Sequence, residues 1–291
     1  MVEDIKKAAD DFLGQRDALI EKAANTYPFP GPEDKRRITA FGVEYDILYV
    51  PWRGKRREKG DIPPPFIKDR AYEIIKNEEI WRYNKYVITP NKYPFSKRQI
   101  LLWEDNRLRE PSANLISLSY LIVAKLKGYT GLMNTTGSAA TIPKAHMQIA
   151  NIERRPAVAE FPMKWKHYND FKIGFPAEES KFQVFYICFS GDAIAIGKIV
   201  ENILIQRRCT SFNIIIFEDL LYLFPRLKET KKEAYPYPLG ALELAGCFAF
   251  EHKEPFLNTT SKKIEQAITE SCYPNKEKYK YNLLEIIVEN K

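Results

Sequence analysis

The stretch from Asn134 to Gln148 combines a turn of small side chains with a histidine, and this pattern can do chemistry on a phosphate. It reads NTTGSAATIPKAHMQ and contains one of the three histidines in the chain. Glycine and short side chains let backbone N–H groups approach an anion closely, as they do in phosphate-binding nests. A histidine that faces the bound anion can attack phosphorus as a nucleophile. The sequence therefore predicts a phosphate cradle that is followed by a nucleophile, His146.

The residue types in this stretch suggest that the turn binds phosphate and that the strand after it carries the reactive side chains. An alternating strand would place Lys144, His146 and Gln148 on one face, where the lysine could supply a cation for a leaving phosphate. A free imidazole has a pKa of about 6.5 and is largely neutral near pH 7, and a strand carbonyl or a cradle hydroxyl could fix its tautomer. The alternative for His146 is an ordinary buried histidine. The predicted phosphate ligands in the turn are Asn134, Thr136, Gly137, Ser138 and Thr141.

The same residues resemble the catalytic strand of the histidine-triad superfamily, in its transferase branch. That branch includes galactose-1-phosphate uridylyltransferase, diadenosine tetraphosphate phosphorylase and GDP-L-galactose phosphorylase. Its signature is an Asn-led turn of small residues followed by His-x-His-x-Gln, and Lys144 stands here at the first histidine position. The resemblance implies that His146 is the nucleophile and that Gln148 goes with group transfer rather than hydrolysis. The turn is most similar to that of GDP-L-galactose phosphorylase.

Segments on both sides of the motif resemble further parts of this family, in the same order, over roughly residues 40 to 270. The segment ITPNKYPFSKRQILLW is similar to the nucleoside-binding hairpin of the family. This resemblance implies that Asn91, Lys92 and Tyr93 contact the nucleoside. Asn91 could equally be a turn residue ahead of Pro94.

Charged residues outside the motif extend the candidate site. The segment ILYVPWRGKRREKG is similar to a basic strand and loop of the uridylyltransferases, which implies phosphate contacts by Arg53 and Arg56. Glu243 lies in LELAG, which resembles a strand of the plant phosphorylases and implies contact with sugar hydroxyls or an acceptor. A carboxylate on an edge strand needs no such function, and this alternative stays open. The two remaining histidines, His167 and His252, are interpreted as ordinary surface residues.

The net charge of +7 has a visible source in the basic run between Arg53 and Lys59. Such a run can bind phosphates, form a nucleic-acid patch or be a solvated loop. The family resemblance favours phosphates, and we do not expect nucleic acid as a partner. No apolar run approaches the roughly 20 residues that span a bilayer, and the N-terminus has no signal-peptide core. We therefore expect a cytoplasmic protein that does not contact membranes.

The cysteines give no sign of a metal site. Cys188, Cys209, Cys247 and Cys272 lie far apart and form no Cys-x-x-Cys pair. Three of them lie in apolar segments and are typical of small core residues in a reducing compartment. The uridylyltransferases often carry zinc on such a pair together with histidines, and this chain does not supply that ligand set. We expect no structural metal and no cofactor.

Apolar periodicity, turn residues and the family resemblance together predict an α+β fold made of two histidine-triad-like units, with antiparallel sheets and packed helices. We expect a charged linker around residues 160–180, with Ser112 as an N-cap and Gly128 as a helix stop. The expected helices span 3–24, 112–127, 192–208 and 260–272. The expected strands are 41–52, 81–91, 98–105, 129–135, 144–152, 182–189, 212–217, 221–226 and 241–250. The predicted division is an N-terminal helix in 1–30, a first unit with the motif in 31–172 and a second unit in 173–291, in one compact body.

These observations predict a nucleotidyltransferase of the phosphorylase type. Its donor would be a nucleoside diphosphate sugar, with GDP-hexose favoured, or a dinucleoside polyphosphate, and a nucleotidyl group on His146 would pass to phosphate or to a phosphorylated acceptor. The expected partners are this nucleotide substrate, phosphate and, since relatives commonly pair, a second copy in a homodimer. Two alternatives are a histidine-triad nucleotide hydrolase and a catalytically inactive nucleotide- or RNA-binding protein marked by Lys144.

Overall fold

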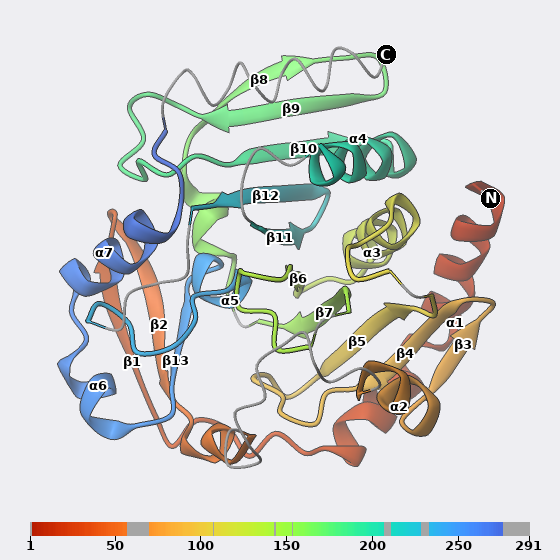
Figure 1. Cartoon of the computed structure of the whole chain (residues 1–291), viewed down its shortest axis with the longest axis horizontal. Coiled ribbons are helices and arrows are strands. Elements are labelled where there is room, and N and C mark those ends of the chain that lie inside the picture. Colours follow the sequence, from red (N-terminus) through yellow and green to blue (C-terminus); the bar gives the residue numbers. More distant parts are fainter. Residues whose placement is uncertain are drawn as a thin grey trace.

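Ten strands pair side by side in one antiparallel sheet that runs through the molecule (Figure 1). The computed structural model describes residues 2–56, 70–106, 108–142, 144–152, 154–206, 211–227 and 233–275. In spatial order the strands are β3 (Trp81–Tyr83), β4 (Tyr86–Pro90), β5 (Gln99–Glu104), β7 (His146–Asn151), β6 (Tyr129–Asn134), β11 (Ser211–Phe217), β12 (Leu220–Arg226), β10 (Ile187–Gly191), β9 (Phe171–Pro176) and β8 (Met163–His167).

Each half of this sheet is built from five strands and one helix in the same order along the chain. The first half runs β3, β4, β5, α3 (Ala113–Lys125), β6 and β7, and the second runs β8, β9, β10, α4 (Ala193–Ile205), β11 and β12. The halves meet where β6 pairs with β11, with Leu132 opposite Ile215. This arrangement confirms the predicted α+β fold with a duplicated unit, antiparallel sheets and packed helices. The expected boundary between residues 172 and 173 falls inside β9.

Three helices, α1 (Val2–Thr26), α3 and α4, cover one face of the sheet and bury a large apolar core against it (Figure 1). The side chain of Ser112 caps α3 by accepting a hydrogen bond from Leu115 N at 3.1 Å, which confirms the predicted N-cap. Asp192 caps α4 in the same way. The two helices touch at Gly197, where an added Cβ would lie 2.2 Å from Ser117 Oγ, so only glycine permits this approach.

A smaller sheet packs against the opposite face and joins distant parts of the chain. It contains β1 (Asp34–Ala40), β2 (Val43–Tyr49) and β13 (Cys247–Phe250), and β2 and β13 run parallel. Its apolar residues share a core with those of the large sheet. The same layer holds η1 (Pro51–Arg56), η2 (Ala157–Glu160), α5 (Ala241–Leu244), α6 (Lys253–Asn258) and α7 (Ser261–Ser271). Further along this face, α2 (Arg70–Asn77) packs over Val87, Leu101 and Trp103.

Two segments differ from the sequence prediction. The charged linker expected around residues 160–180 is instead the hairpin of β8 and β9. Because β8 is the outermost strand of the sheet, Lys164 and Lys166 face solvent while Trp165 and Met163 pack on Gly174, so a charged strand resembles a linker. The strand expected at 241–250 is wrong in its first part, where Ala241–Leu244 form the short helix α5.

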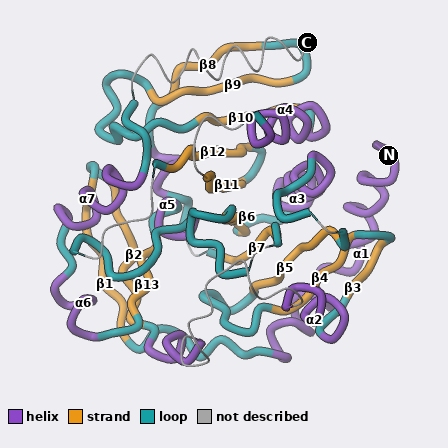
Figure 2. Tube along the Cα trace, viewed as in Figure 1, coloured by secondary structure: helices purple, strands orange, loops and turns teal. Residues whose placement is uncertain are grey.

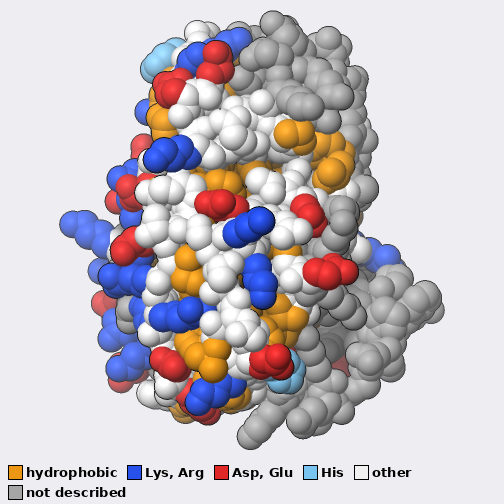
Figure 3. Space-filling view, turned by 90° about the vertical axis from the view of Figure 1, so that its left-hand side faces the viewer, with side chains coloured by type: hydrophobic (Ala, Val, Ile, Leu, Met, Phe, Trp, Pro, Cys, Tyr) orange, Lys and Arg blue, Asp and Glu red, His pale blue; other side chains and the backbone are white. Residues whose placement is uncertain are grey.

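The remaining features concern the apolar character of the helices, the surface charges, the cysteines and the other histidines. In the part of the chain that the structure describes, no helix combines the length and the apolar character needed to cross a membrane. Lys and Arg side chains alternate with Asp and Glu over the face formed by the small sheet, α6 and α7 (Figure 3). Cys188, Cys247 and Cys272 are buried free thiols, and Cys209 lies outside the described residues. The two other histidines, His167 at the end of β8 and His252 before α6, are exposed as expected.

Candidate functional site

His146 is the first residue of β7 and lies directly opposite Trp103 of β5. The two rings are stacked, with centroids 4.4 Å apart and planes inclined by 29°. The Nδ1 atom lies 2.9 Å from the backbone oxygen of Lys144. A carbonyl can only accept, so Nδ1 carries the proton and Nε2 keeps its lone pair. The carbonyl of Lys144, which precedes β7, thus fixes the tautomer, and the lone pair of Nε2 stays available.

The surroundings of His146 keep its ring neutral. Only 8% of the residue is exposed. Burial lowers the pKa of His146 below its ordinary value of 6.5, the hydrogen bond to the Lys144 carbonyl raises it, and the charge of Lys144 lowers it again. The neutral imidazole is the form that can attack phosphorus. The ring is therefore in its reactive protonation state near pH 7.

Gln148 lies two residues beyond His146 on the same strand and faces the same side of the sheet. Its Oε1 accepts a hydrogen bond from Gln99 Nε2 at 3.0 Å, and Gln99 Oε1 accepts from Phe95 N at 2.9 Å. These two bonds orient the amide of Gln148. Within the described residues nothing accepts from Gln148 Nε2, so this NH₂ group is available to a phosphate oxygen.

Lys144 does not continue this strand face. Strand β7 begins only at His146, so the alternation that would align Lys144 with His146 and Gln148 does not extend to it. Its ammonium group donates to the backbone oxygen and to Oδ1 of Asn106. Burial lowers the pKa of Lys144, while the charges of Asp105 and Glu104 raise it. Lys144 therefore acts on His146 through its carbonyl, which binds Nδ1, and through its charge, which lowers the pKa of the ring.

The cradle loop, residues 135–145, connects β6 to β7 and passes beside α5 (Figure 2). Gly137 has φ of 87° and Ala139 has φ of 70°, so both residues adopt the left-handed conformation. Thr136, Gly137 and Thr141 are exposed, as expected of phosphate ligands. Several backbone N–H groups of the loop have no acceptor among the described residues; they belong to Thr136, Gly137, Ala139, Ala140 and Thr141. These amides can receive an anion.

Ser138 has a different place in the loop from the one predicted. It is fully buried, and its hydroxyl lies 2.6 Å from the carbonyl of Phe212 and 2.8 Å from that of Thr135. Its oxygen also accepts from Thr135 N at 3.0 Å. These bonds occupy the hydroxyl, so Ser138 fixes the loop to β11 rather than facing a phosphate.

Asn134 also holds the loop in place. Its Oδ1 accepts hydrogen bonds from Asn213 Nδ2 at 2.7 Å and from Ala241 N at 2.8 Å. Asn213 Nδ2 donates in addition to the carbonyl of Ser138 at 3.0 Å, and the buried Arg226 donates to Asn213 Oδ1. The second half of the sheet therefore anchors the loop of the first half through Asn213.

Arg53 lies on the same side of the sheet as Gln148. It belongs to η1, and its Cζ lies 5.8 Å from the ring centroid of Phe95, the residue whose N–H binds Gln99. Its Nε is buried and has no hydrogen-bond partner among the described residues. Burial raises the pKa of Glu243 while the charge of Arg53 lowers it, so Arg53 lies near that carboxylate, and a phosphate contact by Arg53 stays a prediction. The side chain of Arg56 lies outside the described residues.

Glu243 is not on an edge strand but in the first turn of α5. It is 7% exposed, and its carboxylate accepts from Gly240 N at 2.8 Å and from the Tyr235 hydroxyl at 3.0 Å. Burial raises its pKa, and these hydrogen bonds lower it. Both oxygens are engaged, so the carboxylate caps its own helix, and the predicted contact with a sugar has no support from this geometry.

The three predicted nucleoside ligands lie directly after β4. Asn91 Oδ1 accepts a hydrogen bond from Tyr93 N at 3.0 Å, which is the geometry of the turn residue that the sequence left as an alternative. Lys92 is exposed, and Tyr93 is partly buried. A nucleoside contact by these residues stays a prediction.

The side chains that orient the predicted residues were not themselves predicted from the sequence. Trp103, Gln99, Asn213 and Arg226 reach the site through strand pairings between distant segments. No local sequence pattern identifies these side chains as part of the site. The one available signal is that Trp103 lies near the end of the predicted strand 98–105.

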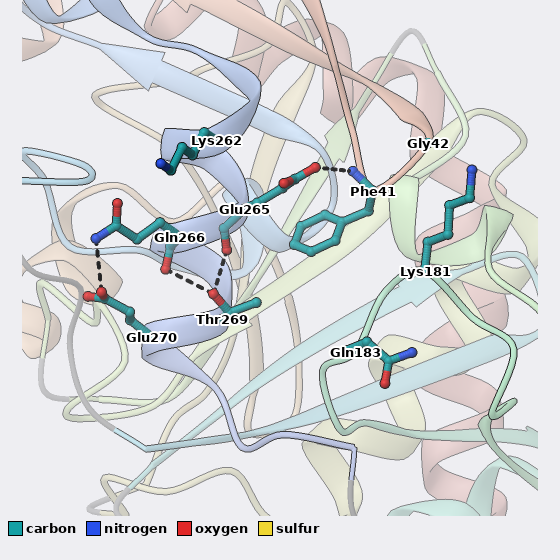
Figure 4. A pocket seen from close by; sticks show the side chains of 9 residues that line it. All are labelled: Phe41, Gly42, Lys181, Gln183, Lys262, Glu265, Gln266, Thr269 and Glu270. Carbon is teal, nitrogen blue, oxygen red and sulfur yellow. Dashed lines mark hydrogen bonds between the residues drawn. The ribbon is translucent and has the colours of Figure 1, made fainter.

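The described residues outside the surroundings of His146 provide neither a metal site nor a pocket that joins this candidate site. No cluster of three or more His, Cys, Asp or Glu side chains in these ranges could hold a metal ion. A pocket between α7 and the β1–β2 turn shares no residue with the site (Figure 4). In this pocket Glu265 is already bonded to Phe41 N at 2.9 Å.

Comparison with known proteins identifies the fold. No protein-family model matches the sequence, and no curated protein matches it. The yeast Ap4A phosphorylase Apa2 in complex with Ap4A is similar with a TM-score of 0.65 and 13% identity, over 95% of this chain and 98% of that chain. The same yeast protein in complex with AMP gives a TM-score of 0.63 and 12% identity, over 94% and 98% of the two chains. The chain thus has the fold of an Ap4A phosphorylase over almost its whole length, as its resemblance to the transferase branch of the histidine-triad superfamily implied.

Proposed function

We propose that this protein is a nucleotidyltransferase of the phosphorylase type that works through a nucleotidyl-His146 intermediate. The observation that carries the proposal is the fixed imidazole of His146, whose Nδ1 is held by the Lys144 carbonyl and whose Nε2 is free. The NH₂ group of Gln148 lies on the same strand face, and the cradle amides precede this strand in the chain. A nucleophile, a donor to phosphate and an anion-binding loop are the three parts that such a transfer needs.

The chemistry proceeds in two displacements at the α-phosphorus of the donor. In the first, Nε2 of His146 forms a bond to phosphorus, and the bond from phosphorus to the bridging oxygen breaks, which releases the rest of the donor as a phosphate-bearing product. In the second, a phosphate oxygen of the acceptor attacks the same phosphorus and the P–N bond breaks. Gln148 and the cradle amides donate hydrogen bonds to the equatorial oxygens, where negative charge develops. Both steps return His146 to its starting tautomer.

A dinucleoside polyphosphate is the first candidate donor, because one of the solved structures with a similar fold is an Ap4A phosphorylase in complex with Ap4A. A nucleoside diphosphate sugar, with GDP-hexose as the sharpest case, is the second candidate and rests on the sequence of the turn from Asn134 to Gln148. In both cases phosphate or a phosphorylated compound is the acceptor.

Intact mass spectrometry tests the intermediate directly. Purified protein is mixed separately with Ap4A, GDP-hexoses, UDP-glucose and ADP-glucose in the absence of phosphate. We expect a mass increase of one nucleotidyl group with one class of donor, and its loss on addition of phosphate. His146→Ala should form no adduct, whereas His167→Ala, which changes an exposed histidine at the end of β8, should form it normally.

The other outcomes separate the alternatives. Steady release of free nucleotide with water as the sole acceptor would indicate a hydrolase. Binding that is unchanged by His146→Ala, without adduct or turnover in either protein, would indicate a binding protein and contradict the proposal.

A further inference from the structure

We propose that Trp103 is a positioning residue for the nucleophile: its indole fixes the plane of the His146 ring so that Nε2 faces the α-phosphorus. The proposal rests on the function proposed above for His146. It starts from the stacking of the two rings, which lie 4.4 Å apart on paired strand positions. Neither a strand position nor burial alone requires a flat aromatic contact on a histidine.

One hydrogen bond does not fix an imidazole. The torsion that turns a histidine ring about its Cβ–Cγ bond has a broad energy profile, so the Nδ1 bond to Lys144 still allows the ring to tilt about that contact. A flat surface under the ring opposes this tilt. The hydrogen bond and the stack together therefore determine where the Nε2 lone pair points.

The indole is itself held in place. Trp103 is fully buried, and its Nε1 donates to the Thr89 hydroxyl at 2.9 Å. Val87 and Leu101 pack beside it on the same face of the sheet. Thr89, Trp103 and His146 therefore form a chain of contacts across β4, β5 and β7, in which each group orients the next.

Trp81 provides a matched control within the same sheet. It is also buried, at 5% exposure, and its Nε1 donates to Asp11 Oδ1 at 2.8 Å. Its ring contacts Phe12 and Tyr83 in the helix-covered core, on the opposite face from His146. Replacing Trp81 removes an equally large buried indole without touching the nucleophile.

The kinetic test compares the rate of adduct formation in Trp103→Leu, Trp103→Phe and Trp81→Leu. Because small misplacements of a reacting group are costly, we expect Trp103→Leu to slow this step on the order of 10²-fold, with KM unchanged. Trp103→Phe keeps a flat ring and should stay within about tenfold of the wild type. Trp81→Leu should keep the wild-type rate. A wild-type rate in Trp103→Leu, or an equal loss in Trp81→Leu, overturns the proposal.

A second measurement does not depend on activity. Aromatic stacking shifts the proton resonances of the histidine ring upfield, and the chain has only three histidines to assign. We expect His146 to show this shift and a single Nδ1–H tautomer in the wild type and in Trp103→Phe. Trp103→Leu should lose the shift and populate both tautomers. Identical His146 spectra in the wild type and Trp103→Leu would overturn the positioning role.

The two measurements separate this proposal from the function on which it rests. Absence of an adduct in the wild type, with the stacking shift and its loss in Trp103→Leu, would reject nucleotidyl transfer and retain the ring-positioning contact. An adduct in the wild type that Trp103→Leu forms equally fast would retain the transfer and reject the contact's role.

Discussion

The two halves of the large sheet share their architecture but differ at the positions that matter for chemistry. Gln148 pairs with Leu101 and Leu132 in the first half. Tyr222 pairs in the same way with Cys188 and Ile215 in the second half, and Leu132 faces Ile215 at the junction. Tyr222 is therefore the counterpart of Gln148.

Two residues earlier on each strand, the difference is sharper still. The first half has His146 and the second has Leu220. Tyr222 packs among aromatic side chains, with its ring centroid 6.0 Å from that of Tyr186. The second half thus carries apolar and aromatic side chains at the place where the first half carries the imidazole of His146 and the amide of Gln148.

The connection ahead of these residues differs as well. The cradle loop of the first half contains eleven residues, 135–145, whereas Glu218 and Asp219 alone join β11 to β12. Glu218 has φ of 52°, which suits a tight turn. A two-residue turn offers no loop for an anion. The features of the candidate site therefore lie in one long loop and a few strand positions of the first half, and not in the scaffold that both halves share.

The largest expected effect comes from giving the first half the residue of the second. His146→Leu removes the nucleophile and should reduce nucleotidyl transfer on the order of 10⁴-fold or more, because loss of a covalent nucleophile is among the most damaging changes to an enzyme. Leucine fits a buried position beside Trp103, so the thermal midpoint should change little. Turnover with the best donor and a thermal scan measure both effects.

The reverse change is the control for that variant. Leu220→His places an imidazole on the second half, which lacks the loop and the amide. It should create no second adduct. A doubly modified chain in the intact-mass spectrum would contradict the conclusion that the loop and the amide are needed.

Gln148→Glu tests whether the NH₂ group of Gln148, which the second half replaces by Tyr222, donates to the phosphate. The carboxylate can still accept from Gln99 Nε2, but it replaces the NH₂ donor by a negative oxygen next to the phosphate. Removal of one such donor typically costs about 10²–10³ in kcat. We expect a loss in that range with an unchanged thermal midpoint. Near-normal kcat would show that Gln148 does not touch the reacting phosphate.

Local sequence patterns predict the candidate catalytic residues, but they do not predict the side chains that hold those residues in place. The signature around His146 and Gln148 lies within fifteen contiguous residues, and the cap at Ser112 is equally local, so both can be identified without a structure. Trp103 and Asn213 cannot be, because they reach the site through strand pairing between distant segments. Sequence patterns do not encode which strands become neighbours.

Local patterns gave wrong predictions at positions where the contacts of the folded chain determine the structure. The run from Ala241 to Phe250 is apolar enough for a strand, but it bends at Gly246, whose φ of 102° separates α5 from β13. Glu243 therefore lies in a helix turn and not on a strand. Ser138 has the composition of a phosphate ligand, yet the approach of β11 buries its hydroxyl. Composition predicted a loop here, which the structure has, but it could not tell which side chains of the loop face outward.

Asn213→Leu removes the side-chain hydrogen bonds that join Asn213 of β11 to Asn134 and to the Ser138 carbonyl in the cradle loop. The change removes the described donor to the Ser138 carbonyl, and a buried group left unpaired costs about 1–3 kcal/mol. It also removes one acceptor of Arg226, which keeps its bonds to the carbonyls of Leu239 and Ser271. We expect a lower free energy of unfolding and adduct formation slower by about tenfold, since a loosened loop misplaces its amides. Denaturant titration and the mass assay measure the two losses.

A double-mutant cycle with Asn134→Ala is the control for this connection. Asn134 Oδ1 accepts from Asn213 Nδ2, so the two changes should be less than additive. Additive losses of stability would show that the two residues do not support the loop together.

The smallest effect concerns pH. The pKa of His146 lies below its ordinary value of 6.5 in the folded chain, chiefly because of burial. As pH falls below 6.5 the unfolded chain binds the proton first, so the free energy of unfolding decreases until the folded pKa is reached. Adduct formation needs the neutral ring and should therefore stay constant down to pH 6.5 and fall only at lower pH.

Lys144→Met tests whether the charge of Lys144 contributes to the lowered pKa of His146. It removes a positive charge that lowers the pKa of His146 but retains the carbonyl that holds Nδ1. The acid limb of the rate profile should therefore move to higher pH, toward 6.5, while Lys166→Met on the exposed edge strand should leave it in place. An unmoved limb in Lys144→Met would mean that burial alone keeps the ring neutral, and that the lysine at the first histidine position of the family signature acts on the nucleophile only through its backbone.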